Sequence, residues 1–139
     1  MKYLITFIII ISTFITGCSN QIRNEDQNII VEKRNAKTNH YEEFKVIKNN
    51  EKVQQIREIL DKANWKHANV NMARIADYRF IFEFKNPEIQ GQAKAVLYEL
   101  WISLNKDKVE LVINAESKYV QLDKKSSNEL FKILTGKKL

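Results

Sequence analysis

The chain has 139 residues, which is enough for one ordinary domain and too few for two. Hydrophobic residues make up 44% and charged residues 29%, a composition typical of a folded domain and not of a disordered chain. The formal net charge is +6, with basic and acidic residues interleaved. This moderate excess suits an anionic surface, such as phospholipid headgroups or the phosphate-rich polymers of a Gram-positive wall, and equally an ordinary solvated surface; no nucleic-acid partner is expected.

Residues 1–17 predict a secretory signal peptide. A basic start is followed by an almost wholly apolar run, Tyr3–Ile15, and then by small residues. The run is too short to span a membrane, because a spanning helix needs roughly 20 apolar residues. The sequence at its end, Ile15-Thr16-Gly17-Cys18, resembles the lipobox of bacterial lipoproteins.

This resemblance implies that a peptidase cuts between Gly17 and Cys18 and that the Cys18 thiol carries a diacylglycerol. Lipidation also explains the single cysteine of the chain, since a lone thiol in an exported protein calls for a reason. Two acyl chains give the stable attachment that one myristoyl chain does not. We therefore expect a protein anchored by lipid on the extracytoplasmic face of a cell membrane, of the Gram-positive type.

Residues 18–39 are rich in Asn, Gln and charged side chains, and we expect most of them to form a polar tether. A flexible segment of this length spans about 25 Å on average. The apolar residues Ile29–Val31 interrupt the segment, and they either belong to the tether or add an edge strand.

Residues 40–139 predict one domain, which begins with a strand and a helix. Tyr41–Lys48 is expected to be the strand, with Phe44 and Val46 on one side. Asn49 or Asn50 then caps the helix. The apolar residues of this helix follow at helical spacing: Val53, Ile56, Leu60 and Ala63.

A loop over Trp65–Asp77 leads to the clearest alternation in the chain. The side chains expected on one side of this strand are aromatic: Tyr78, Phe80, Phe82 and Phe84. Pro87–Lys94 is expected to be a polar connection. Further strands are expected over Val96–Ile102, Val109–Ile113 and Lys118–Leu122.

The last helix begins after Asp123 or Ser126 as its N-cap, and Gly136 is well placed to end it. The order of elements predicts an α+β fold. We expect a two-layer sandwich, in which an antiparallel sheet of about four to five strands carries two helices on its aromatic face.

Four segments resemble the YhfM-like domain of small Bacillus-type lipoproteins, a likeness that runs from about Glu51 to the C-terminus. They are Asp77-Tyr78-Arg79-Phe80, Leu100-Trp101-Ile102-Ser103, Ser117-Lys118-Tyr119-Val120-Gln121-Leu122 and Glu129–Gly136. In that family a proline often precedes the Asp-Tyr pair, where this chain has Ala76. The resemblance implies an extracytoplasmic lipoprotein of unassigned role and names no activity.

The sequence predicts no catalytic, metal or cofactor site, and we do not expect an enzyme. The two histidines, His40 and His67, lie far apart, and no Cys/His cluster has metal-ligand spacing. Glu99 and Glu110 can face each other across a hairpin, an arrangement that on an exposed sheet face is usually solvated and not catalytic.

Two surfaces are candidates for binding a partner. If the helices cover the aromatic face, the opposite face carries Ile81, Leu97, Trp101, Val112 and Tyr119. Such an apolar patch commonly marks a contact site, unless residues 29–31 fold back over it or the two faces are reversed. The second candidate is an aromatic and basic loop edge made by Trp65, Lys66, His67 and Arg74, unless Trp65 simply closes the end of the core.

These observations favour a membrane-anchored, non-catalytic module that binds another, unknown protein at the cell surface. The alternative is a basic module that rests on anionic wall polymer or lipid headgroups. Binding by such a module weakens steeply with added salt, whereas an apolar protein contact is much less sensitive to salt.

Overall fold

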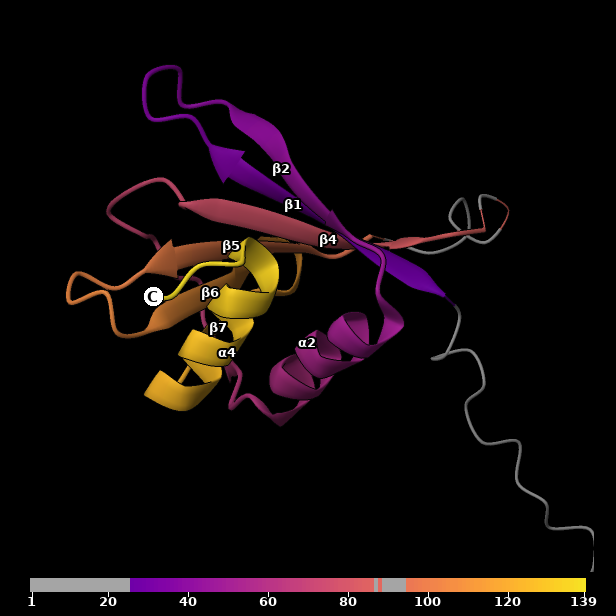
Figure 1. Ribbon diagram of the computed structural model, residues 1–139. Coiled ribbons are helices and arrows are strands. Elements are labelled where there is room, and N and C mark those ends of the chain that lie inside the picture. Colours follow the sequence, from indigo (N-terminus) through magenta and orange to yellow (C-terminus); the bar gives the residue numbers. More distant parts are fainter. Residues whose placement is uncertain (1–25, 87, 89–94) are drawn as a thin grey trace, which may run out of the picture.

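The computed structural model describes residues 26–86, 88 and 95–139 (Figure 1). In chain order the elements are β1 (Gln27–Arg34), β2 (Tyr41–Ile47), α2 (Asn50–Lys62), β3 (Lys66–His67), β4 (Tyr78–Phe84), β5 (Leu97–Ile102), β6 (Val109–Ile113), a 3₁₀ turn (Asn114–Glu116), β7 (Lys118–Gln121) and α4 (Lys124–Thr135). The strands form one antiparallel sheet of seven in the order β2-β1-β4-β5-β6-β7-β3. The expected α+β class is confirmed, and the expected number of four to five strands is too small.

The sheet is larger than expected because β1 and β3 join it. Ile29 and Val31 are fully buried at 0% exposure, so the apolar residues that interrupt the polar segment are part of the core. The strand that contains them lies between β2 and β4 and is not at an edge. The folded domain therefore takes in residues 27–34, which the sequence left mostly to the tether.

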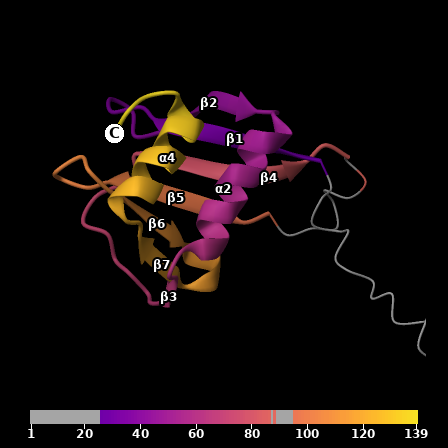
Figure 2. The ribbon, with the colours of Figure 1, turned by 60° about the horizontal axis from the view of Figure 1, so that its bottom comes forward.

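Both helices pack on the same face of the sheet, as expected (Figures 1 and 2). They share one buried cluster with the aromatic strand β4 and its neighbours. Each layer contributes fully buried residues to this cluster: Ile56 of α2, Leu130 and Leu134 of α4, and Phe80, Leu100 and Leu111 of the sheet. The apolar stripe of each helix thus supplies one layer, and the inward side of the strands supplies the other.

The ends of the helices are fixed by the residues that the sequence singles out. The Asn49 side chain accepts a hydrogen bond from the backbone N–H of Lys52 at 3.0 Å, so it is the N-cap of α2. Asp123 accepts from the N–H of Ser126 at 2.8 Å and caps α4. Gly136 ends α4 in the left-handed conformation with φ 76°.

A serine fixes the start of α4 against the sheet. Ser127 is 0% exposed, and its hydroxyl accepts a hydrogen bond from the N–H of Val109 at 2.9 Å. The same hydroxyl donates to the carbonyl oxygen of Leu122 at 3.2 Å. The buried hydroxyl therefore has both a donor and an acceptor as partners. It satisfies two backbone groups, the N–H of Val109 and the carbonyl oxygen of Leu122.

A β-bulge in β2 reverses one prediction. The register shifts between Val31 and Glu32, because Val31 pairs with Lys45 and Glu32 pairs with Glu43. Phe44, the extra residue, packs against the main core, whereas Val46 lies opposite Ile30 on the other face. Phe44 and Val46 thus do not share a side.

The bulge also leaves a lysine on the inner face. The Lys45 ammonium donates to the Ile133 carbonyl oxygen of α4 at 3.1 Å. Burial, helped by the nearby charge of Lys52, lowers the pKa of Lys45 below its ordinary value. Lys45 thereby ties the outermost strand to the helix layer.

Candidate binding surfaces

The sheet face away from the helices is partly covered by the segment that connects β3 to β4. Ala76 of this segment forms a second buried cluster with Trp101 and Val112, which are 4% and 2% exposed. Met72 and Tyr119 pack against the cluster. Trp101 and Val112, expected on an open surface, are therefore buried. The two faces are assigned correctly, and the cover comes from residues 68–77 and not from residues 29–31.

Polar contacts hold this segment on the sheet. The indole Nε1 of Trp101 donates to the Arg74 carbonyl oxygen at 2.8 Å. The Asp77 carboxylate accepts from the Arg74 guanidinium at 2.7 Å and from the backbone N–H of Ile102 at 2.8 Å. Trp101 thus contributes to the stability of the fold, and its ring is not available to a partner in this structure.

The rest of the predicted sheet-face patch stays accessible as a row of aliphatic side chains. Ile81 is partly exposed and Leu97 is 39% exposed. The strand register places Ile81 beside Ile30 of β1, which in turn lies beside Val46 of β2. Such a short row on a sheet face is ordinary in size and has no polar anchor of its own.

Tyr119, the fifth residue of the predicted patch, is engaged within the chain. Its hydroxyl donates to the Glu110 carboxylate at 2.7 Å. Burial, followed by this hydrogen bond to a carboxylate, raises the pKa of Tyr119 to about 12. The hydroxyl therefore stays protonated over the physiological range and acts as a donor.

The predicted loop edge is not assembled as one surface. The Trp65 indole donates to the Leu60 carbonyl oxygen at 2.8 Å and packs against the main core, so Trp65 closes the end of the core. Lys66 and His67 are exposed in β3 and pair with β7. Arg74 lies at the other end of the segment, bound to Asp77 as described above.

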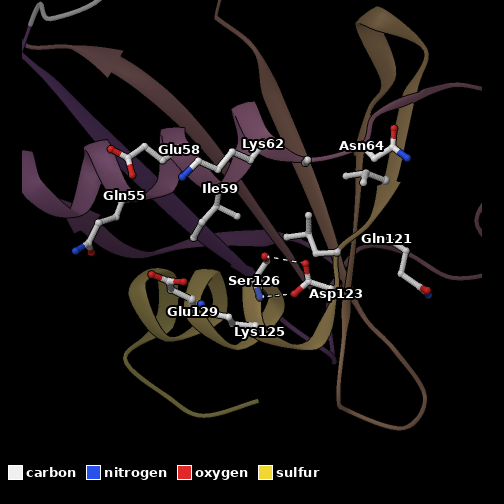
Figure 3. A pocket seen from close by; sticks show the side chains of 13 residues that line it. Gln55, Glu58, Ile59, Lys62, Asn64, Gln121, Asp123, Lys125, Ser126 and Glu129 are labelled. Atoms are coloured by element: carbon white, nitrogen blue, oxygen red, sulfur yellow. Dashed lines mark hydrogen bonds between the residues drawn. The ribbon is translucent and has the colours of Figure 1, made fainter.

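A hollow with a volume of about 550 Å³ forms a groove between α2 and α4 (Figure 3). Its floor is apolar and consists of Ile59, Ala63, Val120 and Leu122. Its rim is polar and consists of Gln55, Glu58, Lys62, Asn64, Gln121, Asp123, Lys125, Ser126 and Glu129. The α2 residues line one side and the α4 residues line the other.

Most of the rim is not committed to contacts within the chain. Asp123 is committed, because it accepts from both the backbone N–H and the hydroxyl of Ser126, and these bonds hold the pKa of Asp123 below its ordinary value. Within the described part of the chain, the side chains of Glu58, Lys62 and Glu129 have no hydrogen-bond or ion-pair partner. The groove thus offers carboxylates and ammonium groups above an apolar floor.

Sequence reasoning missed this groove. Its rim residues occupy the polar sides of two amphipathic helices, a position that predicts only a solvated face. The hollow exists because of the distance at which α2 and α4 pack, and no local pattern reports that distance.

The predicted lipidation residues, metal sites and membrane-spanning helices are considered next. Gly17 and Cys18 lie outside the described residues. Within residues 26–86, 88 and 95–139, no group of three or more His, Cys, Asp or Glu side chains is arranged to hold a metal ion. None of the helices described there is both long and apolar enough to cross a membrane.

Comparison with known families gives one match, to a family model described as YhfM protein, over residues 22–139. The matched region begins ahead of β1, so it includes the strand that extends the sheet beyond the segments of resemblance noted in the sequence. Neither the comparison with curated proteins nor that with solved structures gives a match.

Proposed function

The chain belongs to the YhfM family, and from this premise we propose that it is a lipid-anchored, extracytoplasmic protein-binding module without catalytic activity. Its contact site is the groove between α2 and α4. The observation that carries this proposal is the combination of an apolar floor with a rim of uncommitted charged and amide side chains. Such a combination of apolar pocket and polar rim is typical of protein interfaces.

The chemistry of the groove favours a polypeptide as the occupant. The floor gains about 25 cal/mol for each Å² of apolar surface that a bound side chain removes from water. The rim carries the acids Glu58, Asp123 and Glu129 and the bases Lys62 and Lys125, so its side chains sum to a charge of -1. A rim with a small negative charge does not attract a polyanion, whereas a peptide presents donors, acceptors and both signs of charge.

The anchor that we propose is a diacylglycerol on Cys18, which keeps the domain close to the bilayer. Eight peptide units separate Cys18 from Asp26, the first described residue, and a fully extended chain of that length spans at most about 29 Å. This connection has fewer residues than the expected tether over 18–39, because β1 takes up residues 27–34. A partner bound by the groove is thereby restrained at the membrane surface.

Photo-crosslinking of the lipidated protein in its native membrane tests the groove. A photoreactive residue replaces Gln55 on the rim, and a control chain carries it at Lys37, which is exposed in the turn between β1 and β2. The proposal expects one protein to be crosslinked from position 55 and not from position 37. Equal capture from both positions, or from neither, would contradict it.

Charge reversal gives the matched control. Lys62→Glu with Lys125→Glu is expected to abolish the crosslink, whereas Lys37→Glu with Lys48→Glu, the same charge change at exposed positions away from the groove, leaves it unchanged. If the two double substitutions weaken capture equally, and if added salt also weakens capture by the unsubstituted protein, the module binds an anionic polymer or headgroup surface instead.

The anchor is tested separately. Cys18→Ala is expected to move the protein from the membrane fraction to the soluble fraction and to remove the mass of the lipid from the N-terminal peptide. A chain that stays membrane-bound after this substitution would rule out the proposed anchor and leave the groove untouched.

A further inference from the structure

A second hollow, of about 390 Å³, is lined by residues of the turn between β5 and β6, of α4 and of the segment after α4. Phe131 and Ile102 form part of its apolar floor, and Leu104 stands on its rim. Three cationic side chains line it as well: Arg74, Lys106 and Lys138.

The turn beside this hollow is a tight hairpin turn, in which the N–H of Lys106 donates to the Ser103 carbonyl oxygen at 2.9 Å. Leu104 is 93% exposed, although turns favour polar residues and glycine. Lys106 has φ 56°, a left-handed conformation that costs a residue other than glycine about 1 kcal/mol. The turn therefore presents an apolar side chain to solvent beside the hollow.

The hollow carries a surplus of positive charge. Its carboxylate, Asp77, is already bound by the Arg74 guanidinium at 2.7 Å and by the N–H of Ile102 at 2.8 Å. Lys106 and Lys138 are exposed, and their ammonium groups have no hydrogen-bond or ion-pair partner among the residues that the structure describes. An apolar floor beside two unpaired ammonium groups complements an apolar side chain flanked by carboxylates.

The hollow lies far from the point at which the proposed anchor joins the domain. The turn between β5 and β6, which lines the hollow, lies at the end of the sheet opposite to the start of β1 (Figures 1 and 2). The eight residues of β1 alone extend about 26 Å between these ends. The proposed anchor therefore joins the domain at the end remote from the hollow. This step rests on the proposed lipid anchor.

We propose that the hollow formed by Leu104, Lys106, Phe131 and Lys138 binds an acidic segment of a partner protein, in which an apolar residue lies between aspartate or glutamate residues. The apolar residue packs on Phe131 and against Leu104, and the carboxylates pair with the two lysines. This contact is separate from the groove between α2 and α4 and places a second protein segment at the end of the domain remote from the proposed anchor.

The test uses the full lipidated chain in nanodiscs of zwitterionic lipid and a displayed library of random peptides as the probe. The expected result is enrichment of peptides with an apolar residue between acidic ones. Binding of these peptides should weaken about tenfold with Lys106→Glu and Lys138→Glu together, from the loss of two ion pairs and the added repulsion. Leu104→Asp should weaken binding as well.

Lys62→Glu with Lys125→Glu serves as the matched control and should leave the affinity of the enriched peptides unchanged. If the enriched peptides show no acidic bias, or depend on the helix groove instead, the inference is wrong even where the proposed function holds. If anionic vesicles of phosphatidylglycerol bind through Leu104 and Lys106 in place of peptides, the hollow is a lipid contact. Because the two lysines and Leu104 are exposed, we expect these substitutions to leave the fold intact. Urea unfolding of each variant measures whether its stability is unchanged.

Discussion

Substitution of Trp101 by alanine is expected to lower the stability of the fold. It is not expected to act by removing an exposed contact. Trp101 is 4% exposed, packs against Ala76 and Val112, and donates its indole N–H to the Arg74 carbonyl oxygen at 2.8 Å. The substitution opens a cavity in the second cluster and leaves a backbone carbonyl without its partner. The segment over residues 68–77 thereby loses one of its attachments to the sheet.

The magnitude follows from the buried area. A buried tryptophan removes about 150–250 Å² from water, which at 25 cal/mol per Å² corresponds to about 4–6 kcal/mol. The methyl group of alanine retains part of this, and the lost hydrogen bond adds about 1 kcal/mol. We expect the free energy of unfolding to fall by about 4 kcal/mol, and the melting temperature to fall by about 20 °C.

Leu97→Ala is the matched control, because Leu97 lies on the same strand and the same face and is 39% exposed. It should lower the free energy of unfolding by about 1 kcal/mol. Urea unfolding followed by far-ultraviolet circular dichroism measures both variants without relying on tryptophan fluorescence. If Trp101→Ala destabilises no more than Leu97→Ala does, the covering segment is not packed on the sheet as described.

Three further predictions concern other parts of the chain. Ser127→Ala removes the partner of two buried backbone groups and should lower the free energy of unfolding by about 3 kcal/mol in urea; an effect below about 1 kcal/mol would contradict this pairing. Gly136→Ala should destabilise by about 1 kcal/mol in thermal unfolding, since φ 76° disfavours a side chain while open space surrounds the position; an unchanged melting temperature would refute the strain. The pKa of Tyr119, about 12 against an ordinary 10.0, makes its stabilising effect complete below pH 10 and lost as the pH rises toward 12. Tyr119→Phe should therefore show a smaller alkaline decline in unfolding free energy, and an identical decline would count against the bond to Glu110.

Local patterns account for most of the elements. The alternation over Tyr78–Phe84 and the helical spacing that begins at Val53 depend only on neighbours in the sequence, and both are seen in the structure. For α2 the sequence offered Asn49 or Asn50 as the N-cap, and the structure has Asn49. For α4 it offered Asp123 or Ser126, and the structure has Asp123.

Features that depend on distant partners were not accessible in this way. The strand containing Ile29 lies among polar residues, and only its pairing with both β2 and β4 makes it central. The bulge at Phe44 changes which side chains share a face, and no residue type announces it. The strand alternation alone predicts that Trp101 is exposed. It is buried because Asp77 and Arg74 hold residues 68–77 over it. The helix groove likewise follows from tertiary packing.

The bulge and the inward lysine of β2 have a consequence for a protein held in many copies on one membrane. The outermost strand of an open sheet carries a row of backbone groups to which another copy can add its own strand, and crowding at a surface increases such encounters. At one edge the ladder is broken at Phe44 and a charged side chain, Lys45, points inward, while at the other edge β3 has only two residues. Neither edge is a long, regular template, so dense display on a membrane need not lead to edge-to-edge aggregation.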